Sequence, residues 1–143
     1  MNEEKIFDPR SAAQELFTAR RNREPCEPVA GKYEVNMLEQ AYTVQDELIK
    51  RFNQAGQKVV GYKLGLTDPK AQARMALDRP LFGKLVEKWG YPDGASIPTE
   101  QLISPRVEGE VAFIFSAAVN DPQVDEDTLI ASIDKVVPAL EVC

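Results

Sequence analysis

Two glutamates that are two residues apart, Glu108 and Glu110, are the first candidates for chemistry in this sequence. They lie within residues 103–115, where apolar side chains recur at every second position, and this alternation predicts a β-strand. Side chains two apart on a strand share a face, so the two carboxylates stand side by side and repel each other. An oxygen-preferring divalent cation would remove that repulsion, whereas a solvent-exposed strand face needs no ligand. The pattern alone favours the solvent-exposed face.

A second candidate is Lys63, on a strand predicted over residues 58–66. It shares its face with Gly61 and Gly65, and glycine lets a ligand or another backbone approach a strand closely. Lys63 is therefore either a cation that faces a pocket or a surface lysine on an edge strand, and the residues alone favour the second interpretation. Asp78, in the loop that follows, is by its pattern a turn residue.

Histidine is absent from the 143 residues, which excludes a Ser-His-Asp triad, a Cys-His pair and any zinc site with histidine ligands within this sequence. Acid–base chemistry must then use Asp, Glu, Lys, Tyr or water. The two cysteines, Cys26 and Cys143, form no close-spaced metal or redox motif.

The elements that would position these residues predict an α+β fold, in which N-terminal helices pack on a mixed β-sheet. Apolar stripes predict helices over residues 11–23 and 37–54, the second with Asn36 as its N-cap. A final strand over residues 135–142 places Glu141 near its end. We expect one domain, with residues 1–57 as a helical part and residues 58–143 as a β-rich part.

Composition narrows the classes of partner. The apolar fraction of 43% is ordinary for a folded protein, and the formal net charge of −6 argues against nucleic acid or an anionic membrane as the main partner. No apolar run is long enough to span a bilayer, and the N-terminus lacks the apolar core of a secretory signal, so a cytoplasmic protein is expected.

Five motifs in order resemble those of the 2-keto-4-pentenoate hydratases and 4-oxalocrotonate decarboxylases, which belong to the fumarylacetoacetate hydrolase superfamily. They are AYTVQ (residues 41–45), VGYKLGLT (60–67), DRPLFG (78–83), PRVEGEVAF (105–113) and VPALE (137–141). The resemblance covers the chain from about residue 37 to its end. It implies that the fold is the first portion of the β-rich fold of that superfamily.

The resemblance also implies a site. Mg²⁺ or Mn²⁺ would be held by Glu108, Glu110 and Glu141. With the resemblance, a metal site becomes the favoured interpretation of these glutamates, ahead of a solvent-exposed strand face. Lys63 matches the lysine of the family's active site, and Asp78 matches an acidic position in its substrate loop.

The activity implied is hydration of a 2-hydroxy-2,4-dienoate to a 4-hydroxy-2-oxo acid in aromatic catabolism. The metal would stabilise charge on the substrate's 2-oxygen, Lys63 would face the carboxylate or enolate, and Asp78 would pass a proton or orient water. The nearest alternative is 4-oxalocrotonate decarboxylation, which uses the same metal and enolate chemistry but releases CO₂.

Members of this family continue well beyond their VPALE strand, whereas this sequence ends at Cys143. A different class of function therefore stays open, namely a catalytically silent fragment or a subunit that a partner chain completes. An incomplete sheet leaves an edge that pairs with a neighbour, so a homo-oligomer is expected.

Overall fold

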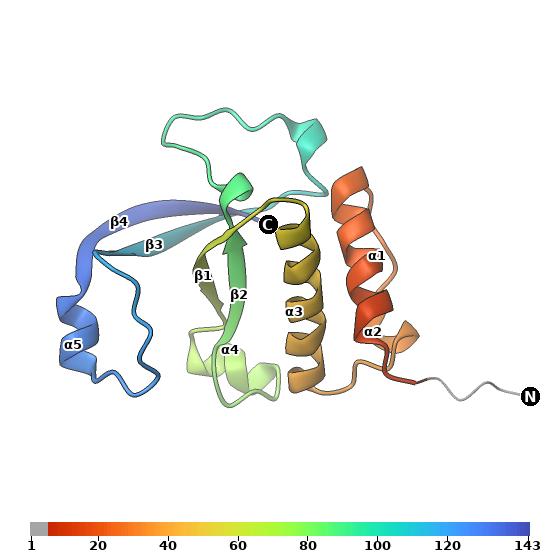
Figure 1. The fold of residues 1–143 in the computed structure, drawn as a ribbon, viewed down its shortest axis with the longest axis horizontal. Helices are drawn as coiled ribbons and strands as arrows, with labels where there is room; N and C mark the ends of the chain where they lie inside the picture. Colours follow the sequence, from red (N-terminus) through yellow and green to blue (C-terminus); the bar gives the residue numbers. More distant parts are fainter. Residues whose placement is uncertain (1–5) are drawn as a thin grey trace, which may run out of the picture. The chain divides into compact units, whose positions relative to one another are not determined.

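The computed structural model describes residues 6–143, and its elements divide into two units (Figure 1). The unit that ends at Ile103 holds four helices and two strands: α1 (Pro9–Asn22), α2 (Val29–Lys32), α3 (Leu38–Gln54), β1 (Val59–Gly65), α4 (Pro69–Arg74) and β2 (Leu81–Val86). It also holds short 3₁₀ helices at Glu87–Trp89 and Thr99–Gln101. The unit Ser104–Cys143 holds β3 (Val107–Phe115), α5 (Glu126–Ala131) and β4 (Ile133–Val142).

The α+β class is confirmed, but the strands of residues 6–143 form two antiparallel pairs, β1–β2 and β3–β4, where one mixed sheet was predicted. A parallel pair needs a crossover that carries the chain back to the same end of the sheet. Here each connection joins adjacent ends, because Gly65 pairs with Leu81 and Phe115 pairs with Ile133. The predicted division of the chain after residue 57 stays a prediction.

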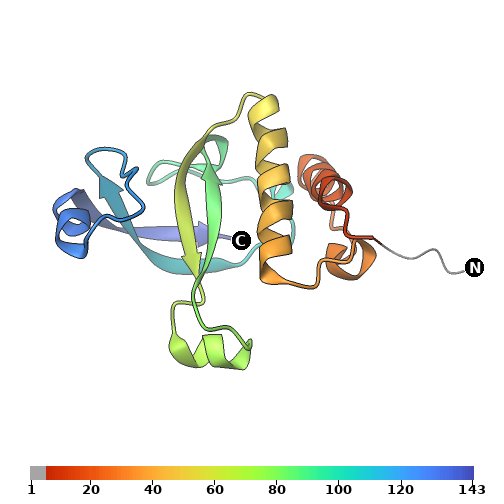
Figure 2. The same ribbon diagram turned by 60° about the horizontal axis from the view of Figure 1, so that its bottom comes forward.

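Helix α3 lies between α1 and the β1–β2 pair, as two views of the ribbon show (Figures 1 and 2). Ala12, Ala13 and Val44 are buried where α1 meets α3. On the other side of α3, Ile49, Phe52 and Val86 form a second buried cluster. Together these clusters fix β2 against the helical layer.

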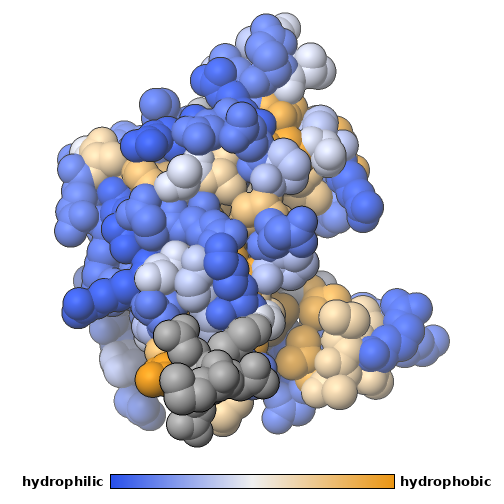
Figure 3. Space-filling model, turned by 90° about the vertical axis from the view of Figure 1, so that its right-hand side faces the viewer, coloured by the Kyte–Doolittle hydropathy of each residue, from blue (hydrophilic) through white to orange (hydrophobic). Residues whose placement is uncertain are grey.

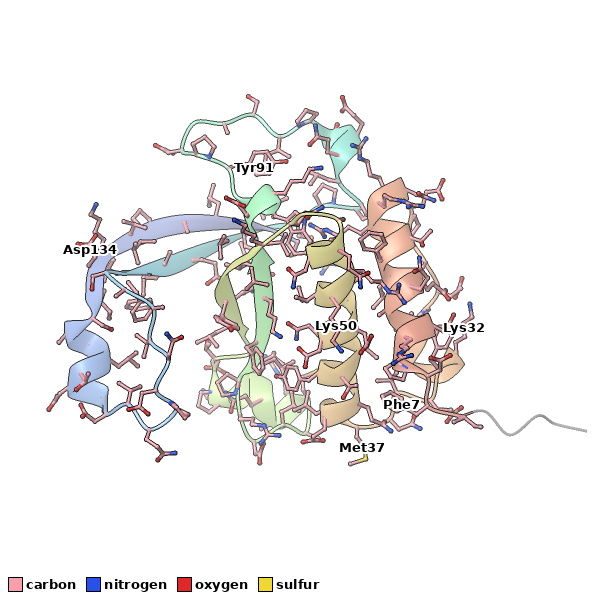
Figure 4. All side chains as sticks on the ribbon, viewed as in Figure 1. Phe7, Lys32, Met37, Lys50, Tyr91 and Asp134 are labelled. Atoms are coloured by element: carbon pink, nitrogen blue, oxygen red, sulfur yellow. The ribbon has the colours of Figure 1, made fainter. Side chains whose placement is uncertain are left out.

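The ends of the two long helices follow capping rules. The Asp8 carboxylate accepts a hydrogen bond from the backbone N of Ser11 (3.0 Å) and begins α1. At α3 the predicted cap at Asn36 is wrong by one residue, because Met37 is the N-cap (Figure 4). The side chain of Gln40 accepts hydrogen bonds from the backbone N atoms of both residues, at 2.7 Å from Asn36 and 3.0 Å from Met37.

Helix α2 is attached to α1 by one carboxylate. Glu15 accepts hydrogen bonds of 2.6 Å from both the Lys32 ammonium and the Tyr33 hydroxyl. The Lys32 ammonium and then the Tyr33 hydroxyl hold the pKa of Glu15 below its usual value.

The two faces of β1 differ in exposure. Val60, Tyr62 and Leu64 are 58–64% exposed, whereas Lys63 and its neighbouring glycines are partly buried. On the α1 and α2 side of the molecule, hydrophilic side chains cover most of the surface (Figure 3). Among the described residues, no helix combines the length and the apolar character needed to cross a membrane.

Replacing Val86 with Ala should lower the free energy of unfolding by about 2 kcal/mol, because two methyl groups are lost from a packed cluster. Val86 is 1% exposed, and it packs with Ile49 and Phe52. Urea denaturation measures the change. The matched control is Val60→Ala at a site 61% exposed, where a change of less than about 0.5 kcal/mol is expected. Equal losses in the two variants would contradict the packing assigned to Val86.

Candidate metal centre

The β3–β4 pair brings three glutamates to one face. Cross-strand partners in an antiparallel pair point to the same side, and Glu108 lies directly opposite Glu141. Glu110 is two residues along β3 from Glu108, so it shares that face, with Ala139 opposite it. The predicted strands therefore place all three acidic residues together.

The geometry of the three carboxylates suits a single ion. One oxygen of each of Glu108, Glu110 and Glu141 lies within 4.8 Å of one oxygen of each of the other two. Oxygen ligands lie about 2.0–2.6 Å from Mg²⁺ or Ca²⁺, so two ligands of one ion are separated by at most about 5 Å. Glu108 is exposed, while Glu110 and Glu141 are partly buried. A cation could therefore enter from solvent on the Glu108 side.

The opposite face of this strand pair is apolar. It carries Val107, Val111, Phe113, Val136 and Leu140, all more than half exposed. Strand alternation thus places all three glutamates on the other face, where their negative charge is concentrated beside Ala112, Val137 and Ala139.

Cys143 lies beside the glutamates, although the sequence analysis did not connect it with them. Its backbone exchanges hydrogen bonds with Arg106 and so extends the strand pair by one step. Its thiol Sγ is 3.8 Å from Oε1 of Glu108. Strand alternation could have predicted this position, since Cys143 is two residues beyond Glu141 and its side chain therefore points to the same face.

Lys63 and Asp78 lie in the other unit. Lys63 is paired with Gly83 of β2, so a third glycine joins Gly61 and Gly65 on its face. A Cβ atom added at Gly65 or Gly83 would meet nothing within 4 Å. The strand face of Lys63 is thus free of side chains at these two positions, whereas a Cβ atom at Gly61 would lie 3.8 Å from Cδ1 of Leu85.

Asp78 lies in the loop between α4 and β2. Its side chain is 91% exposed, and its Oδ1 is 4.0 Å from Nε of Arg79. Arg79 in turn makes an ion pair with Glu39 of α3 at 3.1 Å. The loop is therefore attached to the helix beside Asp78, while the Asp78 carboxylate points to solvent.

Known proteins resemble the chain along nearly its whole length. A 4-oxalocrotonate decarboxylase of Pseudomonas putida is 30% identical over 142 residues, which are 99% of this chain and 53% of that protein. A 2-keto-4-pentenoate hydratase of Paraburkholderia xenovorans (strain LB400) is 32% identical over 131 residues, 92% of this chain and 49% of that protein. No family model matches.

Solved structures agree with these relatives. The 4-oxalocrotonate decarboxylase of Pseudomonas putida G7, complexed with calcium and acetate, superposes with a TM-score of 0.85 at 30% identity, covering 94% of this chain and 52% of that one. Its complex with magnesium and adipate gives a TM-score of 0.84, covering 94% and 51%. The chain spans about half the length of the relatives that it matches. By sequence and by fold, it belongs to the family of 2-keto-4-pentenoate hydratases and 4-oxalocrotonate decarboxylases.

Proposed function

We propose that this chain carries the cation site of an enzyme that adds water to a 2-hydroxy-2,4-dienoate and yields a 4-hydroxy-2-oxo acid. The observation that supports it most directly is the convergence of Glu108, Glu110 and Glu141 within 4.8 Å on one strand face. Relatives that carry the names of hydratases acting on such dienoates match about nine-tenths of the chain.

The donor set fits a hard divalent cation. Three carboxylates supply only oxygen, the ligand atom preferred by Mg²⁺ and Mn²⁺. The solved relative complexed with calcium in one structure and with magnesium in the other supports the same ion class. A cation bound there would stabilise the negative charge that develops on the 2-oxygen of the substrate.

Lys63 is proposed to bind the anionic end of the substrate. Gly65 and Gly83 lie beside it on its strand face, and a Cβ atom at either position would meet nothing within 4 Å, so a flat carboxylate can approach over these two glycines. A charge-assisted hydrogen bond from Lys63 would fix the orientation of the dienoate.

Asp78 is proposed to orient the attacking water or to pass a proton to the substrate. Its carboxylate is exposed on a loop whose attachment to α3 runs through Arg79. An exposed carboxylate can accept a proton from water as water adds to the far alkene carbon.

Decarboxylation of 4-oxalocrotonate is the second candidate, because a decarboxylase matches 99% of the chain and supplies the solved structures. Both reactions need negative charge to be stabilised on the same 2-oxygen, so the glutamates alone do not separate them. We place hydration first, because the residues of the PRVEGEVAF motif and of the Asp78 loop resemble those of the hydratases more than those of the decarboxylases.

The test supplies the full chain with 2-hydroxypenta-2,4-dienoate or with 4-oxalocrotonate, with Mg²⁺ or with EDTA, and follows ultraviolet absorbance. Hydration predicts a Mg²⁺-dependent loss of dienoate absorbance and a product whose mass is that of substrate plus one water. Release of CO₂ from 4-oxalocrotonate without dienoate hydration would favour the decarboxylase.

If neither substrate is converted although Mg²⁺ binds, the chain is a catalytically silent fragment or a subunit that needs a partner chain. Size-exclusion chromatography with light scattering, run on the same sample, tests the expected homo-oligomer.

A further inference from the structure

The side-chain amide of Gln45, on α3, binds the outer edge of β2. Its Nε2 donates a hydrogen bond to the carbonyl oxygen of Phe82 (3.2 Å), and its Oε1 accepts one from the backbone N of Lys84 (2.9 Å). The amide therefore contacts the two residues that flank Gly83. Both its donor and its acceptor are used.

This arrangement imitates a further strand. In an antiparallel pair, alternate residues direct their N–H and C=O groups towards the partner strand or away from it. β1 and β2 form a two-stranded sheet, so the outward groups of β2 would otherwise need water or another partner. A primary amide offers the same donor and acceptor as a peptide group, and Gln45 thus takes the place of one peptide of a third strand.

Two neighbours of Gln45 on α3 strengthen the attachment. The Tyr42 ring stacks on Phe82 with 4.4 Å between ring centroids, and its hydroxyl accepts a hydrogen bond from the backbone N of Phe82 (3.3 Å). Asp46 forms an ion pair with Lys84. Because residues three and four apart share one helix face, these side chains hold consecutive parts of β2 against the same stripe of α3.

The segment held in this way lies opposite Lys63. Gly83, between the two residues bound by Gln45, is the register partner of Lys63 on β1. Buried Val44 packs α3 against α1, and buried Ile49 and Phe52 pack with Val86 at the end of β2. The amide thus connects a well-packed helix to the strand pair that carries the lysine.

We propose that Gln45 is a positioning residue, which fixes the edge of β2 and through it the orientation of Lys63. The role of Lys63 in binding substrate rests on the proposed function, but the position of its side chain does not. The AYTVQ motif (residues 41–45) can then be explained physically, because its Tyr42 and its Gln45 both form hydrogen bonds with the backbone of β2.

The test replaces Gln45 with Met, which keeps the length of the side chain and removes both hydrogen bonds. NMR measures the exchange rate of the Lys84 amide proton and the signals of ¹³C-methylated lysines, with Lys63→Arg used to assign Lys63. Loss of one such hydrogen bond should speed exchange at Lys84 about tenfold. The Lys63 signal should shift or broaden, while that of Lys50, on the exposed side of α3, stays in place.

Two further variants make the result decisive. Gln45→Glu keeps an oxygen that can accept the hydrogen bond from the Lys84 amide, so the exchange rate of that amide proton should stay within about threefold of the wild type. This variant keeps the proposal testable if the Met variant folds poorly. Gln54→Met makes the same chemical change at an exposed position at the end of α3 and should alter neither signal. Unchanged exchange at Lys84, an unmoved Lys63 signal, or equal acceleration by Met and Glu would overturn the proposal.

These measurements need no turnover, so they separate the inference from the proposed function. A wild-type chain without hydratase activity but with the expected exchange pattern would leave Gln45 as a positioning residue and refute only the proposed reaction in this chain.

Discussion

Replacing Glu108 with Gln should weaken binding of Mn²⁺ or Mg²⁺ by about 100-fold or more, because even changes in residues that only orient a metal ligand cost about 10–100-fold. Glu108 lies opposite Glu141 and within 4.8 Å of both other carboxylates, so the substitution removes a charge and leaves a weaker neutral oxygen ligand. Isothermal titration calorimetry, or electron paramagnetic resonance of Mn²⁺, measures the affinity. Metal-dependent hydration should be abolished in the same variant.

Glu110→Gln and Glu141→Gln should also weaken cation binding, since each would remove one of the three proposed metal ligands. The control is Glu100→Gln, which makes the same change of charge at an exposed residue of a 3₁₀ helix. A general loss of electrostatic attraction would weaken cation binding equally in all four variants. That result, or hydration that persists in Glu108→Gln after EDTA treatment, would show that the three glutamates do not form the catalytic metal site.

Replacing Lys63 with Met should lower kcat/KM for dienoate hydration by about 100-fold, because the proposed charge-assisted hydrogen bond to the substrate carboxylate is lost and a misplaced substrate reacts about 100-fold more slowly. The affinity for Mn²⁺ should change much less, because Lys63 supplies no metal ligand. Steady-state kinetics and the calorimetric titration described above measure the two quantities on one sample. A selective loss of turnover would place Lys63 on the substrate.

Lys58→Met is the matched control, since Lys58 is exposed one residue before β1 and only its backbone carbonyl accepts a hydrogen bond, from the backbone N of Glu87. Lys63→Arg keeps the charge but changes its geometry, so partial activity is expected. If Lys58→Met and Lys63→Met reduced kcat/KM equally, a specific contact between Lys63 and substrate would be refuted.

Much of the fold could be predicted from local patterns in the sequence. Apolar stripes predicted α1 and α3 to within two residues at each end, and alternation predicted β1, β3 and β4. Asp68 and Asp125 are the N-caps of α4 and α5, and each accepts a hydrogen bond from the third residue beyond it, at 2.9 Å from Ala71 N and 2.7 Å from Thr128 N. These features depend on neighbours within one turn or one strand, so a single sequence contains them.

The pairing between strands could not be predicted from local patterns. Alternation placed Glu108 and Glu110 on one face, but only the family resemblance connected them with Glu141, because α5 and its loops separate β3 from β4. Gln45 is separated along the chain by 37 positions from Phe82 and by 39 positions from Lys84. No local pattern encodes its contact with these two residues of β2. Gly83 likewise becomes a neighbour of Lys63 only through the strand register.

The direct opposition of Glu108 and Glu141 has a consequence for how the β3–β4 pair folds. Because side chains alternate with a period of two, a slip of β4 by one residue would turn Glu141 towards the apolar side and separate it from the other carboxylates. The native alignment gathers three oxygen donors where a one-residue slip does not, so an ion bound there would favour the native alignment over that slipped competitor. The cation would thus act as a selector of correct strand alignment during folding, before it has any part in a reaction.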